Sequence, residues 1–84
     1  MNKQTEILNL SKFIFNDKEF TRVEFLLKQK ELNLLRLLVS EKLELLYIIQ
    51  DSVETDDVLN LQIQYCNRLE DVVLDYYLEH VELQ

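Results

Sequence analysis

Apolar residues recur along most of this chain at the alternating three-and-four spacing of an α-helix. Between residues 32 and 53 only Lys42 interrupts the pattern. The repeating positions are Leu32, Leu35, Val39, Leu46, Ile49 and Val53. Further leucines and isoleucines fall on the adjacent faces of the same segment, which is typical of a helix that packs on two sides at once.

A second strongly periodic segment occupies the C-terminal third of the chain. Val58, Tyr65, Leu69, Val72 and Tyr76 form one stripe, and a further set of apolar residues widens it beyond one interface. Together with the amphipathic N-terminal segment, the pattern predicts three helices, at about residues 3–14, 17–52 and 56–82. A break in the second helix near residues 30–40 stays open.

Two sets of polar residues mark where these helices begin. Asn16 and Glu19 have the spacing of a capping box, and Phe15 and Phe20 flank them where a hydrophobic staple would stand. Thr55 suits an N-cap, since the aspartates that follow it fall in the first turn, at the positive end of the helix dipole. The short link before Thr55 makes the last two helices antiparallel neighbours.

Composition supports an all-α fold. The 84 residues include no Gly and no Pro, the residues on which most tight turns of a β fold depend. The sequence therefore predicts one all-helical domain, residues 1–84, in which a short N-terminal helix joins a long antiparallel helical hairpin.

The amount of apolar material exceeds what a chain of this length can hide. Apolar residues make up 48% of the sequence, whereas a domain this small buries only about 60% of its unfolded-chain surface. We therefore expect a homodimer that completes a helical bundle. The face expected to meet the second copy or another partner comprises Leu35, Leu38, Leu46, Ile49, Tyr65, Tyr76 and Tyr77.

Charge is distributed unevenly. Residues 1–42 carry eight basic and six acidic side chains, whereas residues 43–84 carry one basic and ten acidic, which together give the net charge of −7. On a helical wheel the last helix gathers Asp71, Asp75, Glu79 and Glu82 on one side. This acidic strip is either a solvated face, a set of ion-pair partners for the lysines, or a docking surface for a basic protein. Nucleic acid is disfavoured as a partner, because phosphate binding depends on cationic patches.

The sequence offers no constellation of catalytic residues. Cys66 and His80 are fourteen residues apart, about 21 Å along one helix, which is too far for a nucleophile–base pair. Cys66 is expected to be a buried apolar group and His80 a packing residue. We expect no metal, no cofactor and no catalytic activity.

The start of the last helix resembles the second helix of the short sporulation aspartyl-phosphate phosphatases. The resemblance spans residues 55–61, residues 66–70 and Tyr76. Cys66, Asn67 and Glu70 stand where that signature has Ser, Gln and Asp, whereas Leu69 and Tyr76 match it. It implies a helical hairpin that removes phosphate from a response regulator.

The N-terminal segment 3–14 is similar to the start of a small plasmid copy-number protein family whose members form dimeric four-helix bundles and bind paired RNA hairpins. On that resemblance Asn9 and Phe13 would face RNA.

Three functions thus remain as expectations. The first is an acidic helical regulator or inhibitor that binds another protein stoichiometrically through a basic or apolar surface of that partner. The second is a phosphatase-like hairpin and the third an RNA-binding dimer. The single cysteine and the lack of a long apolar run predict a cytoplasmic protein without a membrane segment. The Leu, Ile, Asn, Lys and Glu bias favours a low-GC bacterial or phage origin.

Overall fold

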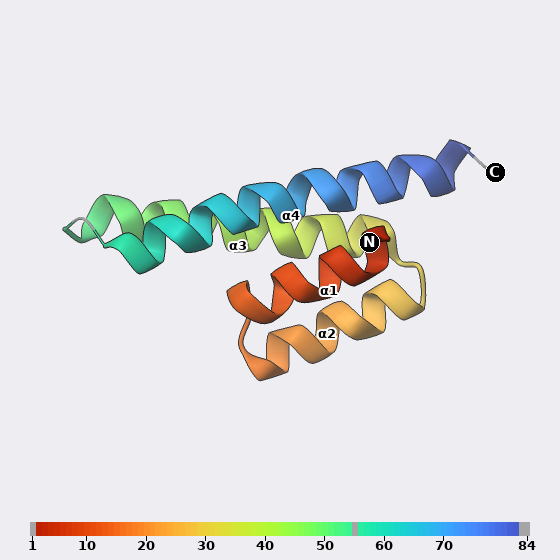
Figure 1. Cartoon of the computed structure of the whole chain (residues 1–84), viewed down its shortest axis with the longest axis horizontal. Helices are drawn as coiled ribbons and strands as arrows, with labels where there is room; N and C mark the ends of the chain where they lie inside the picture. The colour runs from red at the N-terminus through yellow and green to blue at the C-terminus, as the bar shows by residue number, and fades with distance from the viewer. Residues whose placement is uncertain (1, 55, 83–84) are drawn as a thin grey trace.

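The structure, a computed structural model, describes residues 2–54 and 56–82, and these form four helices (Figure 1). The helices are α1 (Lys3–Ile14), α2 (Asp17–Lys28), α3 (Leu32–Ser52) and α4 (Asp57–Glu82). The predicted all-α class is confirmed. The three predicted segments are helical, and the break left open near residues 30–40 is present, since the segment 17–52 is divided into α2 and α3 between Lys28 and Leu32.

The break between α2 and α3 is a helix C-cap built without glycine. Lys30 has a positive φ of 56°, and two backbone hydrogen bonds close the end of α2, from Lys30 N to Leu27 O and from Glu31 N to Leu26 O. This is the double bond pattern of a Schellman motif, in which the residue after the cap adopts the left-handed conformation. The sequence pattern alone does not show this turn, since glycine is the usual residue there.

The turn between α1 and α2 follows the sequence prediction. Asn16 Oδ1 accepts a hydrogen bond from Glu19 N at 2.8 Å, and Glu19 Oε1 accepts one from Asn16 N at 3.2 Å. The predicted capping box is therefore confirmed. Phe15 is buried beside it and Phe20 packs against the core.

Helix α4 begins one residue later than predicted. Asp56 Oδ1 accepts hydrogen bonds from Val58 N at 2.9 Å and Leu59 N at 3.5 Å, so that an aspartate satisfies the free amides of the first turn. The N-cap predicted at Thr55 lies outside the described residues.

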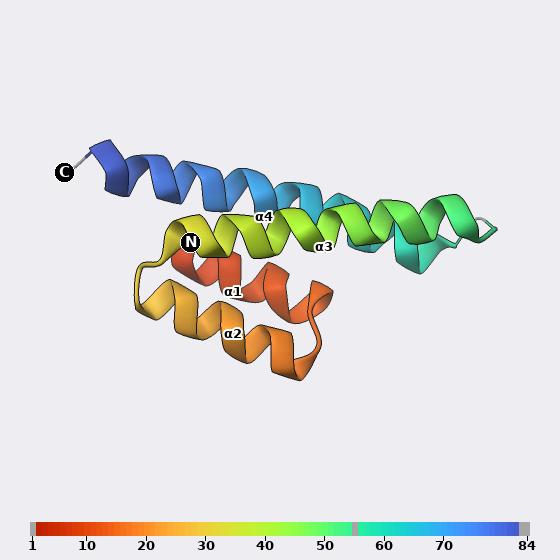
Figure 2. The same ribbon diagram turned by 180° about the vertical axis from the view of Figure 1, so that it is seen from behind.

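The four helices are arranged in two unequal halves (Figures 1 and 2). In one half each helix packs against two neighbours, α1 on α2 and α4, and α3 on α2 and α4. This half, here called the bundle half, is a four-helix bundle in which successive helices run in opposite directions. In the other half only the end of α3 and the start of α4 remain, and they project beyond α1 and α2 as a two-helix arm (Figures 1 and 2). We define the arm as residues 46–54 and 56–62.

The hydrophobic core lies mainly in the bundle half. Its fully buried side chains come from α1, α2, α3 and α4 alike. They are Ile7, Ser11, Val23, Leu35, Val39, Cys66, Leu69 and Val73. Ser11 is accommodated because its hydroxyl donates a hydrogen bond to Ile7 O at 2.6 Å, which leaves no buried polar group without a partner among the described residues.

Candidate partner-binding surfaces

The acidic strip lies along the outer side of α4. Asp71 and Asp75 are exposed. Glu79 forms an ion pair with Lys3 at the start of α1. The strip is thus partly neutralised at the end where α1 begins. Asp71 and Asp75 take part in none of the described ion pairs and form its unneutralised part. The side chain of Glu82, the fourth predicted member, lies outside the described residues.

Electrostatics at the neutralised end favour the charged form of Lys3. Its pKa is raised, chiefly because the ammonium donates a hydrogen bond to Glu79. Desolvation opposes this effect, and the negative charges of Glu79 and Asp75 add to it. A second ion pair joins Arg68 Nε to Glu6 Oε1 at 2.9 Å. Both pairs connect α4 to α1, so part of the acidic surface serves to attach α1.

Two exposed leucines lie beside the unneutralised part of the strip. Leu74 and Leu78 are exposed on α4 and follow Asp71 by three and seven residues, so they share its side of the helix with Asp75. We call Asp71, Leu74, Asp75 and Leu78 the α4 outer face. Wheel analysis of the carboxylates alone missed the two leucines. The spacing i, i+3, i+4, i+7 would have placed them there.

The predicted apolar face is divided by the structure. Leu35, Leu46 and Tyr76 are buried within the chain itself, at 0%, 5% and 3% exposure, and so do not face a partner in this fold. Leu38 and Tyr77 are partly buried against the core, and Tyr77 lies beneath the guanidinium of Arg36 at 4.6 Å from the ring centroid. Ile49 and Tyr65 remain exposed.

The exposed members belong to a larger apolar surface on the arm. Every residue from 47 to 54 is exposed, so the end of α3 beyond Leu46 contributes no buried side chain. The surface that α1 and α2 cover in the bundle half continues along the arm as a group of six exposed apolar side chains, here called the arm face. Ile49, Val53, Val58 and Leu61 belong to the arm, and Phe13 of α1 and Tyr65 of α4 form the inner edge.

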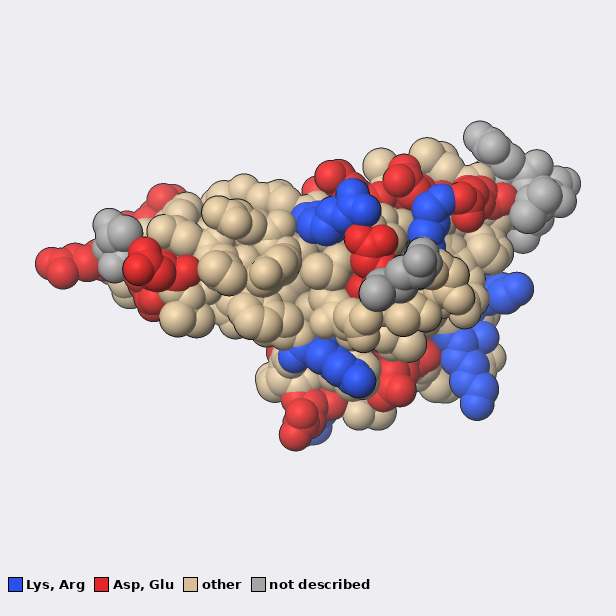
Figure 3. Space-filling model, in the orientation of Figure 1, with Lys and Arg blue, Asp and Glu red and all other residues tan. Residues whose placement is uncertain are grey.

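Contacts at its inner edge show which way the arm face points. The Phe13 ring meets Tyr65 edge-to-face at 4.8 Å between centroids, and Val58 and Leu61 lie seven and four residues before Tyr65, on the same side of α4. On α3, Lys42 contacts Glu19 of α2 at 3.4 Å, and Ile49 lies seven residues further along the same side. Figure 3 shows a wide uncharged area between the acidic tip of the arm and the bundle half.

A pocket of about 300 Å³ adjoins the arm face, lined by Glu6, Asn9, Leu10, Phe13 and Tyr65. It contains both residues that the plasmid-protein resemblance would place against RNA. Asn9 and Phe13 are exposed there, and the one charged residue in the lining is the carboxylate of Glu6, which already pairs with Arg68.

Cys66 lies inside the bundle half. Its side chain is fully buried, with Sγ 3.8 Å from Val39 O. Burial raises the pKa of the Cys66 thiol to about 11 because a thiolate would be desolvated there, and the charge of Glu70 adds to the effect while Lys42 opposes it. The side chain therefore acts as a small apolar group at neutral pH.

The polar positions of the phosphatase resemblance make contacts between α3 and α4. Asn67 Nδ2 donates to Tyr47 Oη at 3.2 Å, and Ser40 Oγ donates to Glu70 Oε2 at 3.0 Å. His80, further along α4, donates from Nδ1 to Tyr76 O at 2.9 Å and stacks on the Tyr76 ring. Asn67 and Glu70 thus link α4 to α3, whereas the contact of His80 with Tyr76 lies within α4.

Comparison of the chain with protein-family models, with curated protein sequences and with solved structures finds no match in any of the three. Among the described residues, no group of three or more His, Cys, Asp or Glu side chains is arranged to hold a metal ion. None of the helices, over the part of the chain described, is both long and apolar enough to cross a membrane.

Proposed function

We propose that this protein is a small acidic helical regulator that acts by stoichiometric binding to another protein, and that it does so as a homodimer. The observation that carries the proposal is the α4 outer face, where Asp71 and Asp75 alternate with the exposed Leu74 and Leu78. Acidic and apolar groups at this spacing match a partner surface that combines basic and apolar side chains.

The two kinds of residue contribute differently to such binding. Leucines removed from water supply affinity, at about 25 cal/mol for each Å² of apolar surface buried. Carboxylates supply association rate and discrimination between partners, since a charged surface steers encounter with an oppositely charged one. The net charge of −7 extends this steering to the whole molecule.

Packing in the bundle half supports binding through α4. Leu69, Val72 and Val73 on the inner side of the same helix are buried, so the helix is held firmly while its outer side faces solvent. A partner would therefore meet a preorganised surface, which lowers the entropic cost of association.

The test uses three variants of the tagged protein in lysate from its source cells. Asp71→Lys/Asp75→Lys reverses the charges of the α4 outer face, and Leu74→Ser/Leu78→Ser removes its apolar contacts. Glu41→Lys/Glu44→Lys is the matched control, because it makes the same change of charge at two exposed positions of α3.

A partner is expected to be captured by the wild type and by the control and to be lost with both α4 variants, while circular dichroism shows all four proteins equally helical. The purified partner should then titrate to one chain per site by calorimetry. Recovery of the same proteins with wild type and both α4 variants would overturn the proposal.

A further inference from the structure

The arm is half of a four-helix bundle. Where α1 and α2 are present, they occupy the side of α3 and α4 on which Lys42 and Tyr65 lie. Lys3 pairs with Glu79 and Phe13 meets Tyr65, so α1 ends beside Tyr65. Residues 57–64 of α4 extend past it by about 12 Å, at 1.5 Å per residue. Beyond the end of α1, only α3 and α4 of the four helices continue.

From this arrangement we infer that the arm of a second copy of the chain packs on the arm face, so that two arms form a four-helix bundle between two complete bundle halves. The inference rests on the proposed homodimer and assigns the face that forms it. The arm projects past the α1–α2 turn, so that the arm face and the ends of α1 and α2 bound an open corner of the molecule (Figures 1 and 2). The arm of a second copy in the opposite orientation fits into this corner.

Apolar area is sufficient for such a contact. The six residues of the arm face are between 39% and 65% exposed. At 150–250 Å² for a large side chain, they leave on the order of 500 Å² of apolar surface on each copy. Two copies together would bury on the order of 1,000 Å², which is the size at which specific interfaces begin.

The arm has little else to hold it in isolation. Among the described residues of the arm, only Leu46 and Leu59 have buried side chains. One hydrogen bond, from Gln50 Nε2 to Asn60 Oδ1 at 2.9 Å, also joins α3 to α4 there. A second pair of helices would convert the exposed turns at residues 47–54 into a bundle interior. Four-helix bundles are built in this way from facing apolar sides.

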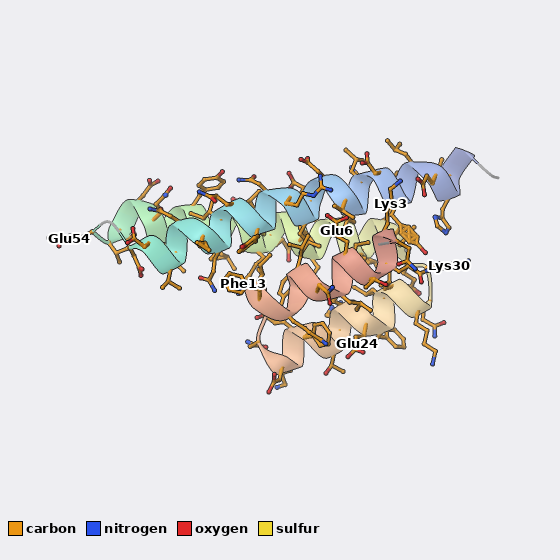
Figure 4. All side chains as sticks on the ribbon, in the orientation of Figure 1. Lys3, Glu6, Phe13, Glu24, Lys30 and Glu54 are labelled. Carbon is orange, nitrogen blue, oxygen red and sulfur yellow. The ribbon has the colours of Figure 1, made fainter. Side chains whose placement is uncertain are left out.

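Charge determines the direction of the pairing. The tip of the arm carries Asp51, Glu54, Asp56 and Asp57 and no basic residue between them, and Figure 4 shows Glu54 at this tip. A parallel pairing would bring the two acidic tips together. A two-fold antiparallel pairing instead places each tip beside the α1–α2 turn of the other copy. That turn carries Lys12 and Lys18 against Asp17 and Glu19, and Glu19 is already paired with Lys42, so the basic side chains exceed the acidic ones by one. A two-fold contact of this kind uses the same surface on both copies.

The first experiment measures mass by sedimentation equilibrium. Wild-type protein should sediment at twice the chain mass of 10.2 kDa. Ile49→Glu/Leu61→Glu places four charges in the proposed interface and should yield monomers with unchanged helical circular dichroism. Phe25→Glu/Leu37→Glu is the control, because both residues are exposed apolar side chains outside the arm face, and this variant should stay dimeric.

The outcomes separate this inference from the rest of the proposal. A wild type that remains monomeric at 100 µM, about a hundred times a micromolar dissociation constant, overturns the homodimer and the arm pairing together. A dimer that survives Ile49→Glu/Leu61→Glu overturns only the arm face. Neither result affects partner capture through the α4 outer face.

The second experiment determines the direction of pairing with a short bismaleimide cross-linker, to which the buried Cys66 is not exposed. Glu54→Cys combined with Lys12→Cys should cross-link into covalent dimers, and Glu54→Cys alone should not. Dimers formed by Glu54→Cys alone would show that the tips meet, which would overturn the antiparallel arrangement.

Discussion

The bundle half and the arm are built from the same two helices and differ in what covers them. In the bundle half α1 packs on α4 and α2 packs on α3, and Leu35 and Leu69 are fully buried between them. In the arm, Ile49 is 47% exposed and Leu61 is 40% exposed. Both are apolar residues at the same helical spacing as the residues of the core. Burial here depends on the length of α1 and α2, which end before the hairpin does.

This difference locates most of the stability in the bundle half and the proposed dimer surface in the arm. Most of the free energy of folding should come from the bundle half, since apolar area removed from water dominates the stability of small domains. The arm retains apolar surface that folding of one chain leaves unused. Exposed apolar surface of this size is typical of interaction sites.

The largest expected effect contrasts Leu69 with Leu61, about two turns apart along α4. Leu69→Ala should lower the free energy of unfolding by about 2–5 kcal/mol, since it leaves a cavity in the core, whereas Leu61→Ala should lower it by less than about 1 kcal/mol in the isolated chain. Urea unfolding at sub-micromolar concentration measures both. Equal losses would mean that the arm is as well covered as the bundle half.

The next effect concerns pH and the buried thiol. The folded-state pKa of Cys66, about 11, lies above its ordinary value of 9.0, so the stability it contributes is complete below pH 9 and is lost as the pH rises from 9 to 11. Within that window the unfolding equilibrium constant should rise by up to about tenfold per pH unit from this group. Cys66→Ala should remove this part of the slope. A variant as pH-sensitive as the wild type would show that the thiol is not the cause.

A smaller effect is expected at the turn that holds α1 against α2. Asn16→Ala removes the side chain that accepts the hydrogen bond from Glu19 N, and should lower the free energy of unfolding by about 1 kcal/mol. Thermal melting of the variant beside Asn2→Ala, which removes the equivalent acceptor from Thr5 N at the start of α1, compares an internal cap with a terminal one. We expect the internal cap at Asn16 to contribute more to stability than the terminal cap at Asn2. A larger loss of stability for Asn2→Ala than for Asn16→Ala would contradict this expectation.

The smallest effect has the opposite sign. Lys30→Gly should raise the free energy of unfolding by about 0.5–1 kcal/mol, because Lys30 has a φ of 56° and glycine adopts this conformation without steric strain. Lys28→Gly, two residues earlier and still in α2, should lower it by about 1 kcal/mol. Destabilisation by both substitutions would rule out strain relief at position 30.

These features divide into those that local pattern specifies and those that it does not. The helical class, the capping box at Asn16 and the alignment of the carboxylates on one side of α4 follow from residue spacing, because each depends on neighbours within one or two turns. The pairing of Glu79 with Lys3 of α1 does not, because it depends on how α1 packs. The separation of α2 from α3 depends on one left-handed lysine, and no glycine or proline signals it. Sequence periodicity therefore left the break between them open and did not fix its position.

The same limit applies to the apolar faces. Leu46 and Ile49 are both apolar positions of one periodic segment, yet Leu46 is buried and Ile49 is exposed. Their difference arises because α2, the helix that packs on this side of α3, begins only at Asp17. Its position is set by another part of the chain. Periodicity identifies a side chain that can be buried, whereas tertiary packing determines whether it is.

The most direct measurement is hydrogen exchange by mass spectrometry at two chain concentrations, one well below and one well above the dimer dissociation constant. Amides of the bundle half should be protected at both concentrations, whereas amides of the arm, residues 46–54 and 56–62, should gain protection only at the higher one. Arm amides whose protection is the same at both concentrations would contradict the claim that a second copy covers the arm.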